Sequence, residues 1–196
     1  MRFSFRLFFC TCLRENLHLM RRSGPKTTVV ERKKQDPAEV RKRTFERAVK
    51  LLAAKPRSVA ELRARLLRSS GANKAVIDTV IERLSEYGYL DDARFAFSYA
   101  SLKVKQRPIG RRRLERDLKF KKVDNSVAEE ALEMVYAETS EEELIDKAID
   151  RRIRLRGRPK DRKEAKSLFD HLLRQGFAFE LVSEKVRAVM KGIDEE

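Results

Sequence analysis

Apolar residues recur at helical spacing from residue 36 onward, and each run is closed by a Gly, Pro or Ser signal. The first run should bury Phe45, Val49 and Leu52, and the second Leu62, Leu66 and Leu67. The pattern predicts helices that start near Asp36, Ser58, Lys74, Asp92, Gly110, Asn125, Ser140 and Asp161, and a last one that carries Leu181 and Val189. No alternating pattern typical of a strand interrupts them, so the sequence predicts an all-α protein.

The helical runs repeat along the chain. Lys55-Pro56, Arg107-Pro108 and Arg158-Pro159 each pair a basic residue with proline, and a helix-starting residue stands two positions after each proline. The prolines are 52 and 51 residues apart. A period of this kind indicates tandem structural repeats. We therefore expect three tandem three-helix repeats that form an elongated, curved array, with units at 36–90, 91–138 and 139–191.

Residues 1–35 lie outside this repeat. We expect a disordered leader or an over-extended start, with Met20 as the true first residue. The apolar run from Leu7 to Leu13 is too short to span a membrane, so no membrane association is expected. Cys10 and Cys12 stand one residue apart and cannot staple a fold, which fits a reducing cytoplasm. With His18 they offer three metal ligands without a fourth, so no metal site is expected.

Composition favours a basic binding protein over an enzyme. The 196 residues carry 46 Lys and Arg against 31 Asp and Glu, a formal charge of +15. This charge is concentrated toward the front, with 12 basic against 5 acidic residues in 41–90 but 14 against 14 in 138–196. Such a protein is attracted to phosphate-rich or acidic partners. No nucleophile motif, phosphate-binding glycine loop or metal-ligand cluster is present, so we expect no catalysis and no cofactor.

Two basic clusters are the strongest functional signal. Arg112, Arg116 and Lys119 fall on one face of a helix whose other face carries Leu114 and Leu118. The second cluster includes Arg152, Arg156 and Arg158. A solvated surface is the alternative explanation for either cluster. The candidate residues for contact with a partner protein or with DNA are Arg57, Arg107, Arg111, Arg112, Arg113, Arg116, Lys119, Arg152, Arg156 and Arg158.

Three-helix units also suggest a helix-turn-helix, whose last helix would read the major groove. The last helix of the second unit instead carries Glu129, Glu130 and Glu133 and no Lys or Arg. Phosphates repel such a helix, so we expect any DNA binding to be weak and nonspecific. Asp91 and Asp92 are interpreted as helix caps and not as a metal-binding pair.

Several motifs together resemble the bacterial RecX family, the regulators of the RecA recombinase. They are Pro56-Arg57-Ser58 with Glu61-Leu62, Gly88-Tyr89-Leu90-Asp91-Asp92 with Arg94-Phe95-Ala96, Gly110 with the arginines after it, and Leu172-Leu173-Arg174-Gln175-Gly176-Phe177. The resemblance covers roughly residues 40–190. One departure is Lys122, where members of the family usually have Gly at the end of a helix.

The resemblance implies a cytoplasmic protein that binds RecA filaments on DNA. We also expect weak, nonspecific binding to single- and double-stranded DNA, and a monomer. It would block filament extension or promote disassembly, which damps recombination, ATP hydrolysis and the coprotease activity that induces the SOS response. The alternative is a nonspecific DNA-binding or nucleoid-type protein that acts without RecA.

Overall fold

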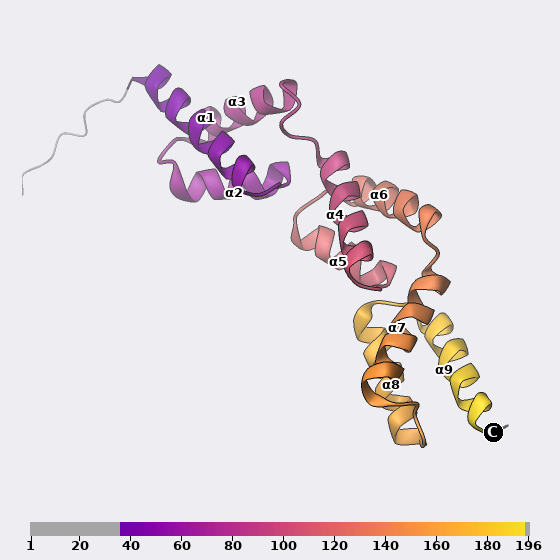
Figure 1. Cartoon of the computed structure of the whole chain (residues 1–196). Helices are drawn as coiled ribbons and strands as arrows, with labels where there is room; N and C mark the ends of the chain where they lie inside the picture. The colour runs from indigo at the N-terminus through magenta and orange to yellow at the C-terminus, as the bar shows by residue number, and fades with distance from the viewer. Residues whose placement is uncertain (1–35, 195–196) are drawn as a thin grey trace, which may run out of the picture. The chain divides into compact units, whose positions relative to one another are not determined.

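The protein is described here by a computed structural model, which covers residues 36–194, with side chains to residue 191. That part of the chain forms nine helices and no strand, which confirms the all-α prediction (Figure 1). The helices are α1 (Pro37–Ala54), α2 (Val59–Ser69), α3 (Lys74–Glu86), α4 (Asp92–Gln106), α5 (Arg111–Phe120), α6 (Asn125–Glu138), α7 (Glu141–Arg156), α8 (Arg162–Gln175) and α9 (Phe179–Asp194). The predictions for residues 1–35, including the metal-ligand candidates and the alternative start, lie outside the described residues.

Side-chain caps begin most of these helices where the sequence predicts them. Ser58, Asp91, Ser140 and Asp161 each accept a hydrogen bond from the backbone N–H three residues later. These bonds satisfy donors that the first turn of a helix leaves without a partner. Asp91 is therefore the cap of α4, while Asp92 has a different contact, described below.

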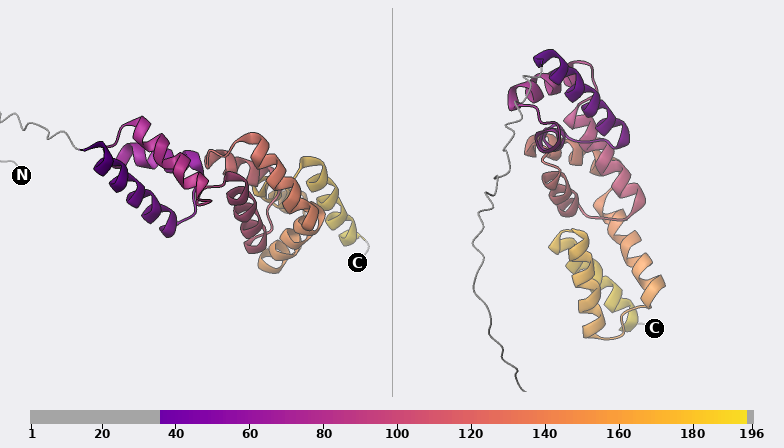
Figure 2. Two further views of the ribbon diagram at one scale, coloured as in Figure 1. Left: turned by 90° about the horizontal axis from the view of Figure 1, so that it is seen from above. Right: turned by 90° about the vertical axis from the view of Figure 1, so that its left-hand side faces the viewer.

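The apolar faces of the helices bury two separate clusters. The first belongs to α1, α2, α3 and the turn after them, and includes Leu62, Leu66, Ile77 and Leu84. The second is continuous from α4 to α9. Within each triplet the third helix packs on both of the others, most extensively α6 on α4. Figure 2 shows the helices from two further directions. No described helix is long and apolar enough to cross a lipid bilayer.

Two predicted core positions are wrong. Val49 is 37% exposed and Leu67 is 47% exposed. The inward positions of α1 are instead Thr44 and Ala48, because small residues there let the helices approach closely. The Thr44 hydroxyl donates to the Val40 carbonyl, which satisfies its polar atom inside the cluster.

Three helices end in the same hydrogen-bonded turn, in which the residue after the helix cap adopts a left-handed conformation. At the end of α3, Gly88 has φ 71° and the Tyr89 N–H donates to the Leu84 carbonyl. At the end of α8, Gly176 takes the same role with φ 92°. At the end of α5 the residue is Lys122, with φ 60°, so the same turn forms there without glycine. The boundaries of the three units at residues 90/91 and 138/139 remain a prediction.

Candidate functional site

The start of α5 is joined to the end of α8 by backbone hydrogen bonds. The Gly110 N–H donates to the Gln175 carbonyl and the Arg112 N–H to the Gly176 carbonyl, both at 3.1 Å. The Arg111 N–H donates to Glu141 Oε1 at 3.1 Å. Gly110 has no side chain to cap α5, and these acceptors take over that function. The two helix ends thereby satisfy each other's free donors and acceptors.

Only glycine fits at this junction. A Cβ on Gly110 would lie 2.3 Å from the carbonyl carbon of Gly176, and one on Gly176 would lie 2.4 Å from the backbone nitrogen of Arg113. Both distances are far below any van der Waals contact, and both neighbours are backbone. The glycines of the two family-like motifs therefore belong to one contact, which fixes α5 and its arginines against α8.

The arginines of α5 divide into two groups. Arg112, Arg116 and Lys119 are exposed and make no ion pair within the described residues. Arg111 is half-buried and lies 4.0 Å from Glu133 Oε1, while Arg113 donates to Gln175 Oε1 at 2.9 Å. The candidate role of the α5 cations in binding a partner stays a prediction, but Arg111 and Arg113 already have contacts within the chain. They lie at the sides of α5, where α6 and α8 come within reach.

Cations in the first turn of α5 oppose the positive end of its helix dipole, where negative side chains are favoured. Local choices that break such a rule are most often found at functional sites. Helix stability therefore does not explain Arg112, the exposed cation of this turn. The carbonyls at the end of α8 offset part of the electrostatic cost of placing cations at the start of α5.

A second cationic group lies where α7 and α8 approach each other. Arg152 donates to the Ser167 hydroxyl at 3.3 Å. Burial, with the charges of Arg156 and Arg174, lowers the pKa of Arg152. Burial also lowers the pKa of His171, and the charges of Arg152, Arg174 and Arg156 add to the shift. The positive charges of these arginines lie close enough to His171 and to one another to disfavour the protonated form of each group.

A hollow of about 250 Å³ lies next to this group. It is lined by Arg107, Pro108, Ala148, Arg151, Arg152, Leu155, His171 and Gln175, and none of these residues is acidic. Arginine forks directed into an acid-free hollow suit the binding of phosphate or carboxylate. The structure thus brings Arg107, at the end of α4, to the same hollow as Arg152, and Arg156 lies close enough to affect both titrating groups.

Sequence reasoning missed Arg174 and His171. Arg174 falls in the last turn of α8, where a cation commonly serves the helix dipole, and His171 stands beside a core leucine. Only packing shows that both face the arginines of α7. Arg158, in the loop after α7, is exposed.

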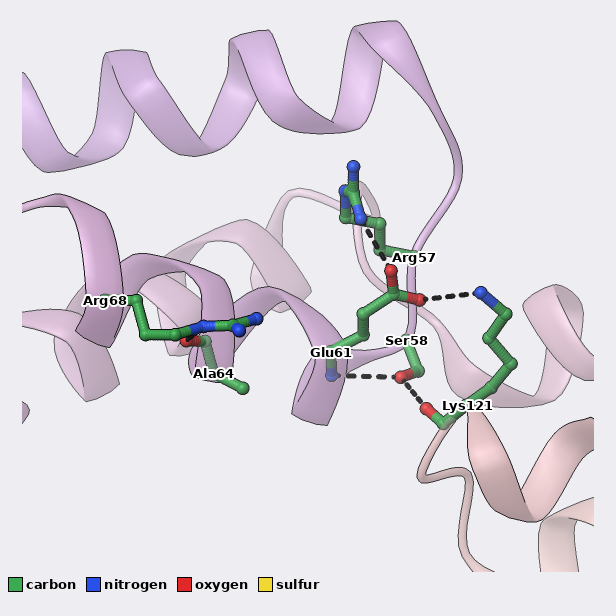
Figure 3. Close-up of polar contacts among 6 residues, drawn as sticks. All are labelled: Arg57, Ser58, Glu61, Ala64, Arg68 and Lys121. Atoms are coloured by element: carbon green, nitrogen blue, oxygen red, sulfur yellow. Dashed lines mark hydrogen bonds and ion pairs between the residues drawn. The ribbon is translucent and has the colours of Figure 1, made fainter. Parts of the chain in front are cut away.

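Arg57 lies away from both groups, in a polar contact between α2 and the end of α5 (Figure 3). Its Nη1 is 2.6 Å from Glu61 Oε1, and the other oxygen of Glu61 is 3.3 Å from Lys121 Nζ. The Ser58 hydroxyl donates to the Lys121 carbonyl. Asp92 adds a further link, because its carboxylate accepts from the Val59 N–H at 2.8 Å. Burial raises the pKa of Asp92, more than this hydrogen bond lowers it.

The described residues contain no group of His, Cys, Asp and Glu that could hold a metal ion. Their acids are engaged as caps or ion-pair partners, or lie scattered on exposed faces.

Comparison with known proteins identifies the family. The model of the first three-helix domain of RecX matches residues 45–84, and that of the second matches residues 91–132. The regulatory protein RecX of Prosthecochloris aestuarii is 30% identical over 136 residues, which cover 69% of this chain and 86% of that protein. The chain belongs to the RecX family.

Further RecX proteins agree. Regulatory protein RecX of Treponema pallidum is 36% identical over 110 residues, which cover 56% of this chain. The chain spans about half to two thirds of the length of the Treponema and Bacillus relatives that it matches. The crystal structure of RecX from Lactobacillus salivarius superposes with a TM-score of 0.68 at 19% identity, covering 81% of this chain and 99% of that one, which shows a shared fold.

Proposed function

We propose that this RecX-family chain binds the RecA filament on DNA and damps its recombinase, ATPase and coprotease activities. It would act as a monomeric, non-enzymatic regulator in the cytoplasm, within DNA repair and the SOS response. The observation that supports this most directly is the exposed cationic face of α5, formed by Arg112, Arg116 and Lys119. A RecA filament on DNA offers phosphates and protein surface together.

The acidic surface of α6 favours nonspecific contact over base readout. Glu129, Glu130 and Glu133 are all exposed on this last helix of its triplet. A helix with these charges is repelled from a DNA groove, whereas α5 is attracted to phosphates. The proposed contact with DNA is therefore made by α5, with the hollow around Arg152 as a second anion site.

The test replaces Arg112 and Arg116 by Glu. We expect the double variant to inhibit RecA ATP hydrolysis poorly at ordinary salt. If each arginine neutralises one phosphate, the negative slope of log affinity against log salt should become shallower by about 1.8 on duplex DNA. Helix content should hold, since Glu forms helices about as well as Arg and suits a first turn. Thermal unfolding and circular dichroism check the fold.

A charge-matched control changes Arg65 and Arg68 of α2, which are also exposed, to Glu. Both double variants alter the net charge by the same amount, so only a local role of α5 separates them. Wild-type inhibition by a folded Arg112→Glu/Arg116→Glu protein would contradict the proposal. Binding of the wild-type chain to naked DNA, without recovery of RecA in a pull-down with single-stranded DNA and a nucleotide analogue, would favour the nucleoid-type alternative.

A further inference from the structure

A wide cleft lies between the end of α1 and the exposed side of α4. Its volume is about 760 Å³, and its floor is apolar, formed by Val49, Leu52, Pro56, Phe95 and Leu102. This is large enough to hold two or three side chains. It is much larger than the hollow beside Arg152.

Several of the apolar side chains at this cleft have no cover within the described chain. Leu102 is 55% exposed and Tyr89 is 61% exposed. Val49, which helical periodicity assigns to the core, points here instead. Apolar groups gathered in one exposed hollow are a usual feature of sites that bind a partner.

The walls of the cleft are strongly basic. Lysines and arginines from three segments line it, against a single acid, Asp91, which is already used as the cap of α4. The cations are Lys55, Arg57, Arg94, Lys103 and Lys121. The cleft therefore has an apolar floor and a positive rim, which is complementary to an apolar group flanked by carboxylates.

A second observation at the cleft is that one donor of the Arg57 side chain has no hydrogen-bond acceptor within the described residues. Its side chain is only 12% exposed, and its Nε is buried without a hydrogen-bond partner within the described residues. Glu61 is shared between Arg57 and Lys121, so one carboxylate serves two cations (Figure 3). A buried donor without an acceptor costs roughly 1–3 kcal/mol. A carboxylate or carbonyl brought by a partner can satisfy it.

We propose that this cleft binds an acidic segment of a partner protein, with an apolar side chain of that segment seated between Val49 and Leu102. The carboxylates of the segment meet the lysines and arginines of the rim. The inference rests on the proposed function, in which the partner is the RecA filament, and it names the surface by which the protein component is held. The face of α5 then remains for phosphates.

The geometry favours a protein over single-stranded nucleic acid as the occupant. Bases bind such grooves by stacking on free aromatic faces. Here Phe95 and Tyr99 stack on each other, with ring centroids 6.0 Å apart, and Lys103 Nζ lies 5.5 Å from the Tyr99 centroid. Tyr89, although exposed, lies edge to face with Tyr87, with ring centroids 6.4 Å apart. Leu102, Val49 and Leu52 offer aliphatic surface, which suits an apolar side chain better than a nucleotide.

The experiment replaces Leu102 by Glu in the full chain and measures binding to RecA filaments on single-stranded DNA, and to the same DNA alone. The matched control is Met134→Glu on α6, because Met134 is 50% exposed and lies outside the cleft. We expect Leu102→Glu to weaken filament binding at least tenfold and to leave naked-DNA binding within twofold. The control should resemble the wild type in both assays, and Leu102→Met should retain filament binding.

Each other outcome overturns a definite part of the reasoning. If the wild type binds filaments and Leu102→Glu binds them equally well, the cleft proposal is wrong and the proposed function stands. If Leu102→Glu loses naked-DNA binding to the same extent, the cleft holds nucleic acid. If the wild type does not bind RecA filaments at all, the proposed function fails and the cleft proposal fails with it. A photo-crosslinker at position 102 should attach to a RecA segment with carboxylates beside an apolar residue.

Discussion

Replacement of Lys122 by Gly should stabilise the protein. Lys122 is the one described residue other than glycine with a positive φ, 60°, and its side chain is exposed. The Lys122 N–H donates to the Lys119 carbonyl and the Val123 N–H to the Leu118 carbonyl, so the turn is complete without the side chain. Val123, the residue after it, is buried. The substitution therefore relieves backbone strain and removes no buried contact.

The expected gain follows from two opposing effects. A left-handed conformation costs an L-residue roughly 1–2 kcal/mol that glycine does not incur. Glycine in turn makes the unfolded chain more flexible, which costs about 0.4–1 kcal/mol. The free energy of unfolding should rise by about 0.5–1 kcal/mol. For a chain of this size the midpoint of thermal unfolding should rise by about 1–4 °C.

The assay is urea unfolding followed by circular dichroism, with the m-value required to stay constant. The reciprocal control is Gly88→Ala, at the corresponding turn after α3. Gly88 has φ 71° and nothing within 4 Å of an added Cβ, so the substitution adds strain without a clash. It should lower the free energy of unfolding by about the amount that Lys122→Gly raises it.

The results for Lys122→Gly and Gly88→Ala together show whether the backbone at Lys122 is strained. A neutral or destabilising Lys122→Gly, next to a destabilising Gly88→Ala, would refute the view that Lys122 is strained. Equal and opposite shifts would show that the two turns are energetically equivalent, although only one carries glycine.

Two further predictions concern the junction of α5 and α8 and the cationic hollow. Gly110→Ala should unfold at markedly lower urea than the wild type, because its Cβ meets the backbone of Gly176; an unchanged midpoint would show that the two helix ends are not in contact. His171 should titrate below the ordinary value of about 6.5, so its contribution to stability is complete above that pH and is lost as pH falls through its lowered pKa. Histidine-ring NMR, assigned with His171→Gln, should show this pKa rise when phosphate-bearing DNA offsets the arginine charges, and an unchanged pKa on DNA binding would place His171 away from the bound phosphates.

Much of the fold could be predicted because its signals are local. Ser58, Asp91, Ser140 and Asp161 cap helices through bonds to their own next turn. The spacing of apolar residues fixes the inner face of a helix wherever that face is fully covered, as at Leu114 and Leu118. The predicted burial of Val49 and Leu67 was wrong, because periodicity shows which residues share a helix face and not how far a neighbouring helix covers that face.

Some features of the candidate site could likewise be predicted from the sequence, and others could not. The sequence by itself determined that Arg112, Arg116 and Lys119 share one face of α5, because 3.6 residues per turn decide this whatever α5 packs against. Only the tertiary structure decided that Gly110 and Gly176 meet, that Nε of Arg57 lacks an acceptor among the described residues, and that an apolar cleft opens at Leu102. Each of these depends on atoms brought together from distant segments, and helix periodicity carries no information about such distances.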